Sequence, residues 1–374
     1  MENKKSQIIK FIELRYADPI SSMDLTDEYL LYGTMLGATK FYIINDQKLI
    51  CLSDTQDEFI SGVKINENKL YICIGDVKIY QYYVGNEEEK RSPDFEIKNY
   101  ESEKQHEEKC ENCLSIFTNN YLIRNYIDYS SSKQKEENEE EEENEKHSKN
   151  NECTDVSFKN IFDNDNRKII ERKIKMSEYS VPFDYDGKNF IFIEFTSPNH
   201  RTFHVYDMDT QEMKDIEIEQ ISNEHIGHIS HLKIINDDLL FIVRDYNICE
   251  IRNFKLEIQK KLNIKASEIL AFDILYGEKI EENKSDVNTD ANKNNDEEIL
   301  YIVLLDIDCN VFLYNYKEDK NELLINLEKE EKGIDKDIKG QGFFLLNYPY
   351  YIKISKKYIA ISSDYGCILI QYNE

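Results

Sequence analysis

Short apolar segments recur along the chain, and many come in pairs separated by only a few polar residues. The clearest pairs are Leu239–Arg252 (LLFIVRDYNICEIR), Leu300–Tyr314 (LYIVLLDIDCNVFLY) and Tyr358–Tyr372 (YIAISSDYGCILIQY). Each pair places two runs rich in Ile, Leu, Val and Tyr around a turn of the form Asp-x-Asn or Asp-x-Gly. Branched and aromatic side chains pack well on a pleated surface, so these segments predict β-hairpins built in the same frame.

The residues between the paired runs are suited to tight turns. A hairpin turn that matches the twist of its strands needs positive φ angles, which glycine and asparagine tolerate, and an aspartate can hold the turn by accepting backbone N–H bonds. We therefore expect Asn247 and Asn310 to take the positive φ angles. We expect Asp245 and Asp308 to accept the backbone bonds of their turns.

The hairpins belong to a repeat in which a short strand precedes each hairpin and a further strand follows it. Seven such units can be traced, at about 22–53, 59–97, 113–174, 179–218, 227–262, 268–327 and 343–372. The seventh unit holds only three strands, whereas segment 7–14 (QIIKFIEL) is a spare strand ahead of the first. Because bare sheet edges invite aggregation, we expect segment 7–14 to pair beside Gly366–Tyr372. The pattern thus predicts one all-β domain over 7–374, a single closed seven-bladed β-propeller whose N-terminal strand completes the last blade.

Three elements of these units resemble the WD40 β-propeller family. The stretch Ser363–Gly366 followed by Ile368–Ile370 looks like the strand–turn–strand core of that family. Gly227-His228 at the head of the fifth unit resembles its Gly-His element, and Gly37–Phe41 is similar to the start of its third strand. The resemblance covers nearly the whole chain as a pattern. It implies a rigid ring with two loop-built faces that hold protein partners.

Two low-complexity segments interrupt the repeat. Segment 130–151 contains EENEEEEENE and lies between the second and third strands of the third unit, and segment 278–298 lies between the first two strands of the sixth. Both lack the apolar residues that would anchor them, so we expect disordered acidic loops. They are either neutral insertions or charged arms for basic partners, and the sequence leaves both interpretations open.

Composition and charge narrow the classes of ligand. Hydrophobic residues make up 40% of the chain, with 26 Tyr, 18 Phe, no Trp, 12 Gly and 5 Pro, which is enough apolar content for a packed core. The formal net charge is −27. An acidic body repels phosphate backbones and anionic lipid heads, so we expect protein partners, including partners with basic surfaces, and no nucleic acid as the main ligand.

The N-terminal segment, the apolar runs and the cysteines indicate the expected cellular compartment. The start MENKKSQIIKF is not followed by a long apolar stretch, so we expect no secretory signal. The longest apolar run, Ile299–Leu305, is too short to span a bilayer, so we expect no membrane insertion. The eight cysteines are scattered, and those in apolar runs are expected to be reduced and buried. We expect a cytoplasmic protein, with the nucleus as the other compartment.

Metal and cofactor sites are not expected from the motifs present. Cys110 and Cys113 form a C-x-x-C pair, but no second pair follows at a spacing typical of zinc sites. Segment 163–166 (DNDN) lacks the Gly and the Glu of a calcium loop. Three histidines lie three residues apart in a loop-to-strand passage, where we expect a capping or core role for the central one: His225, His228 and His231.

No catalytic motif accompanies the repeat: the chain contains no G-x-S-x-G, P-loop or G-x-G-x-x-G sequence. Arginine and tyrosine near the inferred hairpin ends are candidate anchors for a partner, and this selects Arg124, Tyr126, Arg201, Arg244 and Tyr246. The sequence therefore predicts a non-enzymatic scaffold for protein–protein interaction, a subunit of a larger assembly. The alternative is a propeller that binds a small ligand or metal in its central channel, a class that includes enzymes.

Overall fold

The computed structural model describes residues 6–13, 18–54, 59–74, 78–84, 95–97, 114–118, 121–127, 154–160, 169–174, 182–197, 200–218, 226–278, 297–330, 351–363 and 366–372. Within these ranges the strands form seven antiparallel sheets of four strands each. The chain is therefore all-β, as predicted. No helix in these ranges is both long and apolar enough to span a membrane.

Six sheets are built from consecutive strands. Sheet 1 contains β2 (Ile20–Leu25), β3 (Tyr29–Thr34), β4 (Ala38–Ile43) and β5 (Lys48–Asp54). Sheet 2 contains β6 (Ile60–Asn66), β7 (Lys69–Ile74), β8 (Lys78–Tyr83) and β9 (Phe95–Ile97). Sheet 3 contains β10 (Leu114–Thr118), β11 (Tyr121–Ile127), β12 (Thr154–Asn160) and β13 (Ile169–Ile174). Sheet 4 contains β14 (Phe183–Tyr185), β15 (Asn189–Ser197), β16 (His200–Asp207) and β17 (Met213–Glu217).

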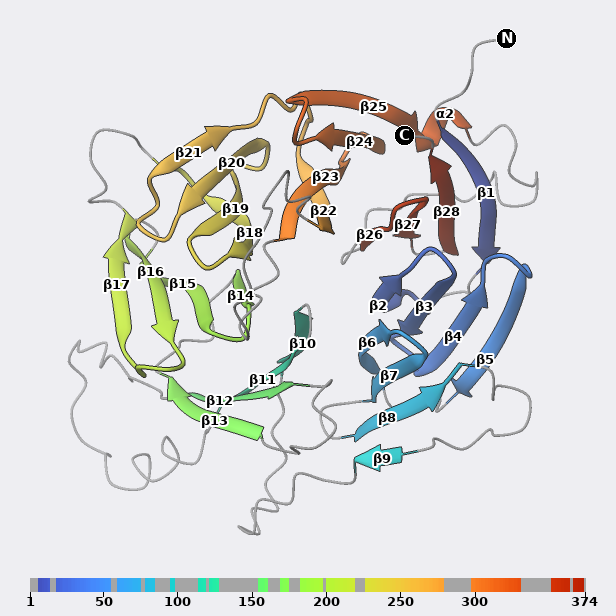
Figure 1. Cartoon of the computed structure of the whole chain (residues 1–374), viewed down its shortest axis with the longest axis horizontal. Coiled ribbons are helices and arrows are strands. Elements are labelled where there is room, and N and C mark those ends of the chain that lie inside the picture. Colours follow the sequence, from blue (N-terminus) through green and yellow to red (C-terminus); the bar gives the residue numbers. More distant parts are fainter. Residues whose placement is uncertain are drawn as a thin grey trace, which may run out of the picture.

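The remaining sheets follow the same order until the end of the chain. Sheet 5 contains β18 (Ile229–Asn236), β19 (Leu239–Arg244), β20 (Ile248–Asn253) and β21 (Ile258–Lys261). Sheet 6 contains β22 (Ile269–Glu278), β23 (Glu297–Asp306), β24 (Asn310–Asn315) and β25 (Lys320–Asn326), followed by the short helix α2 (Leu327–Glu330). Sheet 7 contains β26 (Ile352–Ile354), β27 (Tyr358–Ser363), β28 (Gly366–Tyr372) and β1 (Ser6–Glu13). Figure 1 shows the sheets side by side around a common centre, with the first strand of sheets 1 to 6 and β26 of sheet 7 nearest to it.

The outer strand of sheet 7 comes from the opposite end of the chain. β1 pairs antiparallel with β28, from Ser6 opposite Tyr372 to Glu13 opposite Gly366, with one irregularity between Ile8 and Lys10. This is the pairing that segment 7–14 predicts. It covers the backbone groups of β28 that would otherwise form a free edge.

The core consists of apolar layers between neighbouring sheets. Ile359 and Ile361 of β27 pack with side chains of sheet 6, whereas Ala360 between them packs with Ile20 and Met23 of sheet 1. Because successive side chains of a strand point to opposite faces, a strand that is covered on both faces reads as one unbroken apolar run. This explains why apolar and polar residues do not alternate within the most apolar strand segments of the sequence.

The tight turns differ from the prediction, because other residues than the expected ones take the positive φ angles. The positive φ angles belong to Asp245 (49°), Tyr246 (67°) and Cys309 (59°), and not to the asparagines that follow. The bond predicted for Asp308 comes instead from the aspartate two positions earlier, because Asp306 accepts the N–H of Asn310 at 2.9 Å. The backbone around Cys309 is fixed by burial of its side chain, which is only 4% exposed. Tertiary packing therefore overrides the preference of asparagine for this conformation.

A single charged residue interrupts the apolar face of the innermost strands. It stands between two apolar residues within the first strand of six sheets: Asp24, Lys64, Asp184, Lys233, Asp273 and Lys353. Each aspartate bonds to the backbone of the next sheet, since Asp24 accepts the N–H of Ile65 at 2.8 Å and Asp184 that of Ile234 at 2.7 Å. We call these six residues the inner charge ring. They tie each aspartate-bearing sheet to its neighbour.

Candidate functional site

The turns that join the second and third strands of the sheets lie at one edge, which we call the turn face. It includes the C-terminal ends of β3, β15, β19 and β23. It also includes the segments that come just before the first strand of each sheet. The same backbone bond anchors three of these turns, because Met35 N–H donates to Pro19 O, Asp245 N–H to His228 O, and Ile307 N–H to Glu268 O, at 2.7–2.9 Å. This repeated bond fixes each turn against the segment before its own sheet.

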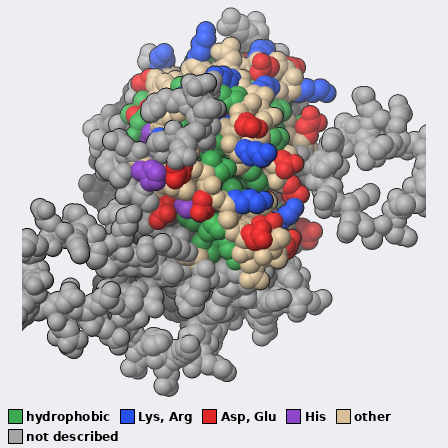
Figure 2. All heavy atoms as spheres, turned by 90° about the vertical axis from the view of Figure 1, so that its left-hand side faces the viewer, with side chains coloured by type: hydrophobic (Ala, Val, Ile, Leu, Met, Phe, Trp, Pro, Cys, Tyr) green, Lys and Arg blue, Asp and Glu red, His purple; other side chains and the backbone are tan. Residues whose placement is uncertain are grey.

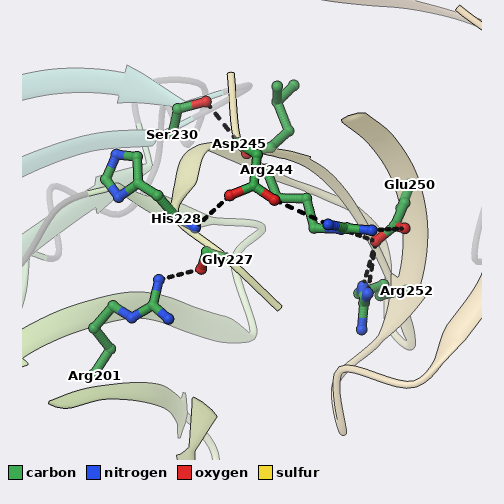
Figure 3. Close-up of polar contacts among 9 residues, drawn as sticks. Arg201, Gly227, His228, Ser230, Arg244, Asp245, Glu250 and Arg252 are labelled. Atoms are coloured by element: carbon green, nitrogen blue, oxygen red, sulfur yellow. Dashed lines mark hydrogen bonds and ion pairs between the residues drawn. The ribbon is translucent and has the colours of Figure 1, made fainter. Parts of the chain in front are cut away.

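Three of the five predicted contact residues meet on the turn face. Arg201 is the second residue of β16 in sheet 4, while Arg244 ends β19 and Tyr246 lies in the following turn of sheet 5. The Arg201 guanidinium donates to the carbonyl of Gly227, which links the two sheets (Figure 3). The other two candidates, Arg124 and Tyr126, lie on β11, and their side chains are outside the described residues.

Arg244 is bound to acidic side chains of its own sheet. Its Nε and Nη2 donate to both carboxylate oxygens of Glu250 at 3.1 and 3.2 Å, and its Nη1 contacts Asp245 at 3.0 Å. Arg252 binds the same Glu250 at 2.6 Å, and the Glu250 side chain is fully buried. Figure 3 shows the two guanidinium groups converging on this one carboxylate. The prediction of Arg244 as a contact residue stays untested, and the structure gives this side chain a role inside sheet 5.

Asp245 holds the segment that enters sheet 5. Its Oδ1 accepts the backbone N–H of His228 at 3.0 Å. Gly227 has a φ of 67°, and a Cβ added there would overlap the Asp245 carboxylate. Only glycine satisfies both the backbone angle and the close approach. The Gly227-His228 pair is therefore explained by the turn that it contacts.

Three rings form a line across sheets 4 and 5, which we call the aromatic row: Phe195, His228 and Tyr246. The ring centroids of Phe195 and His228 lie 6.0 Å apart, and those of His228 and Tyr246 lie 5.3 Å apart. Tyr246 is 47% exposed although its φ of 67° is unfavourable for a bulky residue. A conformation of this kind costs about 1–3 kcal/mol and is often retained at binding sites. The structure thus presents a tyrosine ring at the tip of an anchored turn.

Acidic side chains lie beside the aromatic row on the sheet 6 side. The Tyr246 carbonyl accepts the N–H of Ile269 at 2.7 Å, which places the turn next to the segment leading into β22. Glu268 in that segment is exposed, and the neighbouring Ser267 hydroxyl contacts the exposed Asp308. The row is therefore bordered by Asp245, Glu268 and Asp308.

Apolar side chains on the turn face of sheets 1 and 2 escaped the sequence analysis. Met35 and Leu36 in the β3–β4 turn are 42% and 49% exposed, and Phe59 just before β6 is 41% exposed. The sequence did contain an indication of this exposed apolar surface. Two apolar residues precede Gly37 in a hairpin turn, where they serve no obvious packing purpose. On the outer side of the molecule, by contrast, basic and acidic side chains are interspersed (Figure 2).

Comparisons with known proteins bear on the fold. No protein-family model matches the chain, and no curated protein sequence matches it. The crystal structure of the WD40 β-propeller domain of Doa1 is similar with a TM-score of 0.55 and 10% sequence identity, over 99% of this chain and 98% of that one. The chain has the β-propeller fold. A structure of YCF48 bound to D1 peptide is also similar, with a TM-score of 0.56 and 8% identity over 100% and 99% of the two chains. The resemblance predicted from the turns and from Gly227-His228 is confirmed at the level of the fold.

The inner charge ring of the propeller is mostly self-neutralising. Lys64 contacts Asp24 at 3.2 Å, Lys233 contacts Asp273 at 3.2 Å, and Lys353 contacts Asp273 at 3.7 Å. Sheet 3 has an isoleucine at the equivalent position, because Ile116 precedes its hairpin by the same two residues as Lys64.

Two buried aspartates of the inner charge ring differ in how their charge is compensated. Burial raises the pKa of Asp184 to about 6, and the bond from the Ile234 N–H and the charge of Lys233 offset this only in part. Burial would also raise the pKa of Asp273, but Lys353 and Lys233 together hold it below its usual value. Asp184 is therefore the less well compensated of the two aspartates.

Reactive groups that would suit the catalytic or metal alternative are not assembled in the described part of the chain. No group of three His, Cys, Asp or Glu side chains there could hold a metal ion. Burial raises the pKa of the Cys249 thiol and raises that of Cys367 to about 12, so neither is a thiolate nucleophile. Burial lowers the pKa of His231, whose ring contacts the Leu270 carbonyl at 3.3 Å. The C-x-x-C pair at 110–113, His225 and segment 163–166 lie outside the described residues.

Replacement of the shared carboxylate in sheet 5 is expected to destabilise the propeller. Glu250→Gln keeps the shape of the side chain but removes the counter-charge of Arg252, whose side chain is 2% exposed, and leaves Arg244 with Asp245 alone. Breaking a buried ion pair by removing one partner costs about 3–5 kcal/mol, so we expect a loss of that order in urea unfolding. Glu212→Gln, the same change at an exposed position, is the control. Equal stability of the two variants would show that Glu250 is not structurally important.

Proposed function

We propose that this protein is a non-enzymatic scaffold that binds partner proteins through the turn face of a closed seven-bladed propeller, as a subunit of a larger assembly. The supporting observation is the aromatic row. It presents an exposed tyrosine from a turn whose backbone is bonded to the segments on both sides of sheet 5. A site held rigidly in this way loses little conformational freedom when it binds. Tyrosine is also among the residues that most often anchor protein interfaces.

The closure of the ring is part of this proposal. β1 and β28 join the two ends of the chain in sheet 7, and sheet 7 packs against sheet 1 through Ala360, Leu369 and Met23. We assign the blades to the repeat units of the sequence, with 7–14 completing the last one. A ring without free edges is a suitable platform for an assembly because it cannot extend by strand pairing.

A peptide-bound neighbour of similar fold agrees with a protein ligand. The YCF48 structure contains a bound D1 peptide, and we propose the same class of ligand here, a segment of another protein. The cytosol or the nucleus is the proposed compartment. The central channel is the weaker candidate, because the charged side chains of the inner ring are already engaged with one another.

The proposal is tested by comparing complexes that form on two versions of the protein. Tagged wild type and a Tyr246→Ala/Met35→Ala variant are purified from cells of the source organism, and their partners are identified by mass spectrometry and then reconstituted in purified form. We expect a stoichiometric partner that the double variant fails to retain. Leu323→Ala, which removes a 51% exposed side chain from the outer strand β25, is the control and is expected to keep the partner. A partner that binds all three proteins equally would contradict the assignment of the turn face.

A further inference from the structure

We infer that the aromatic row receives a lysine or arginine side chain from a basic segment of the partner protein. This inference rests on the proposed function and adds the chemistry of the partner. It follows from the faces of the rings, the charges beside them, and the way in which the nearby arginines are occupied.

The exposed ring of the row is presented for contact with a cation. Tyr246 is 47% exposed, and its ring lies 5.3 Å from that of His228, so its position is supported from one side. The negative face of an aromatic ring attracts ammonium and guanidinium groups within about 6 Å. A basic side chain can therefore lie over Tyr246 while its aliphatic part covers the neighbouring apolar surface.

The charges around the row favour a basic ligand over an acidic one. Asp245 has a side chain that is 43% exposed, and Glu268 and Asp308 are exposed on the adjoining sheet. The formal net charge of the whole chain is −27. The negative electrostatic potential of these groups attracts cationic segments and repels anionic ones.

The two arginines near the row do not reverse this preference. Arg244 is bound by Glu250 and Asp245, and its side chain is only 15% exposed. Arg201 donates to the Gly227 carbonyl. An acidic ligand would have to displace these bonds, whereas a basic ligand uses acidic groups that already face the solvent. A segment with at least two basic residues can contact both Tyr246 and the Glu268–Asp308 side of the site.

The test uses two labelled peptides with the full-length protein. An eleven-residue peptide of alternating Arg and Gly, and its counterpart with Glu in place of Arg, are titrated by fluorescence anisotropy at low salt and at physiological salt. We expect the Arg peptide to bind and the Glu peptide to show no binding. Tyr246→Ala is expected to weaken the Arg peptide about fivefold, and Tyr246→Phe by less than about twofold because the ring is kept.

Two further variants separate the site from the overall charge of the chain. Glu268→Gln/Asp308→Asn should weaken the Arg peptide and reduce the salt dependence of its binding. Tyr83→Ala removes an exposed tyrosine at the far end of β8 from the turn face without any change of charge, and should leave the affinity unchanged. If Tyr246→Ala binds the Arg peptide as tightly as wild type does, the attraction is that of the net charge and the inference is overturned.

The outcomes distinguish this inference from the proposed function. If the Arg peptide does not depend on Tyr246 but the purified natural partner does, the turn face is an interface and its ligand is not basic. If neither depends on Tyr246 or Met35, the proposed interface is wrong as well. Binding of the Glu peptide in place of the Arg peptide would reverse the assigned sign of the partner.

Discussion

Replacement of Lys233 by methionine is expected to destabilise the protein by about 3 kcal/mol at pH 7, within the range for breaking a buried ion pair. Lys233 serves two aspartates of the inner charge ring, since it contacts Asp273 at 3.2 Å and its charge also lowers the pKa of Asp184. The Lys233 and Asp273 side chains are 18% and 11% exposed, so water screens them little. Without Lys233, no lysine of the described residues offsets the charge of Asp184, and Lys353 alone among them offsets that of Asp273.

The effect of this substitution depends on pH in a defined direction. The folded-state pKa of Asp184, about 6, is above the usual value near 3.9, so this group favours folding at low pH and loses that contribution as pH rises through about 6. Lys233→Met raises this folded-state pKa further, and raises that of Asp273. The difference from wild type should therefore be largest at pH 7 and shrink as the pH falls toward 5, where protonation removes the uncompensated charge.

Urea unfolding at pH 7 and pH 5 measures this prediction. Lys265→Met, which removes an exposed lysine between sheets 5 and 6, is the matched control and should have little effect at either pH. A Lys233→Met variant that is as stable as the control at pH 7 would show that the inner charge ring does not stabilise the fold. An equal loss at both pH values would point to lost packing of the lysine chain instead of lost charge.

Deletion of residues 1–15 is expected to lower the melting temperature by roughly 5–10 °C, the shift that a loss of several kcal/mol gives in a protein of this size. The deletion removes β1 and exposes the backbone groups of β28 from Gly366 to Tyr372. It should also promote association of the protein through the new edge. Differential scanning calorimetry and light scattering at several protein concentrations measure the two effects.

A peptide that supplies the missing strand is the control for this deletion. Residues 1–15 added as a synthetic peptide should restore the melting temperature and suppress association, while a peptide of the same composition in scrambled order should do neither. A truncated protein that melts like the full-length chain would refute the role of β1 as the fourth strand of sheet 7.

The sequence predicts this fold well where apolar runs and polar turns are clearly separated along the chain. Hairpins such as Leu239–Arg252 have apolar runs on both sides of a polar turn, and β1 was recognisable as a spare strand because the repeat left it unassigned. The angles inside the turns were predicted wrongly, because they depend on side chains that arrive from elsewhere. Cys309 takes its positive φ in a buried position, a fact that asparagine preference cannot anticipate.

The candidate site was predictable only in outline. Arg201, Arg244 and Tyr246 were selected from their places near hairpin ends, and the structure brings them to one region of the turn face. The sequence did not reveal that Arg244 is bound by Glu250, because that contact depends on the pairing of β19 with β20. The inner charge ring did have a signal, a lone charge between two apolar residues at the same place in six units, as in FDI at 272–274.

The position of β1 has a consequence for how the chain becomes folded during synthesis. Glu13 pairs with Gly366, so two strands separated by almost the entire chain must meet before sheet 7 is complete. At about 5–20 residues per second, a ribosome needs roughly 20–70 s to produce β28 after β1 has emerged. The N-terminal strand therefore waits without its partner while the other sheets form, and a contact of such sequence separation is slow to close. During that interval β1 is an unpaired strand that a chaperone or a second nascent chain can engage.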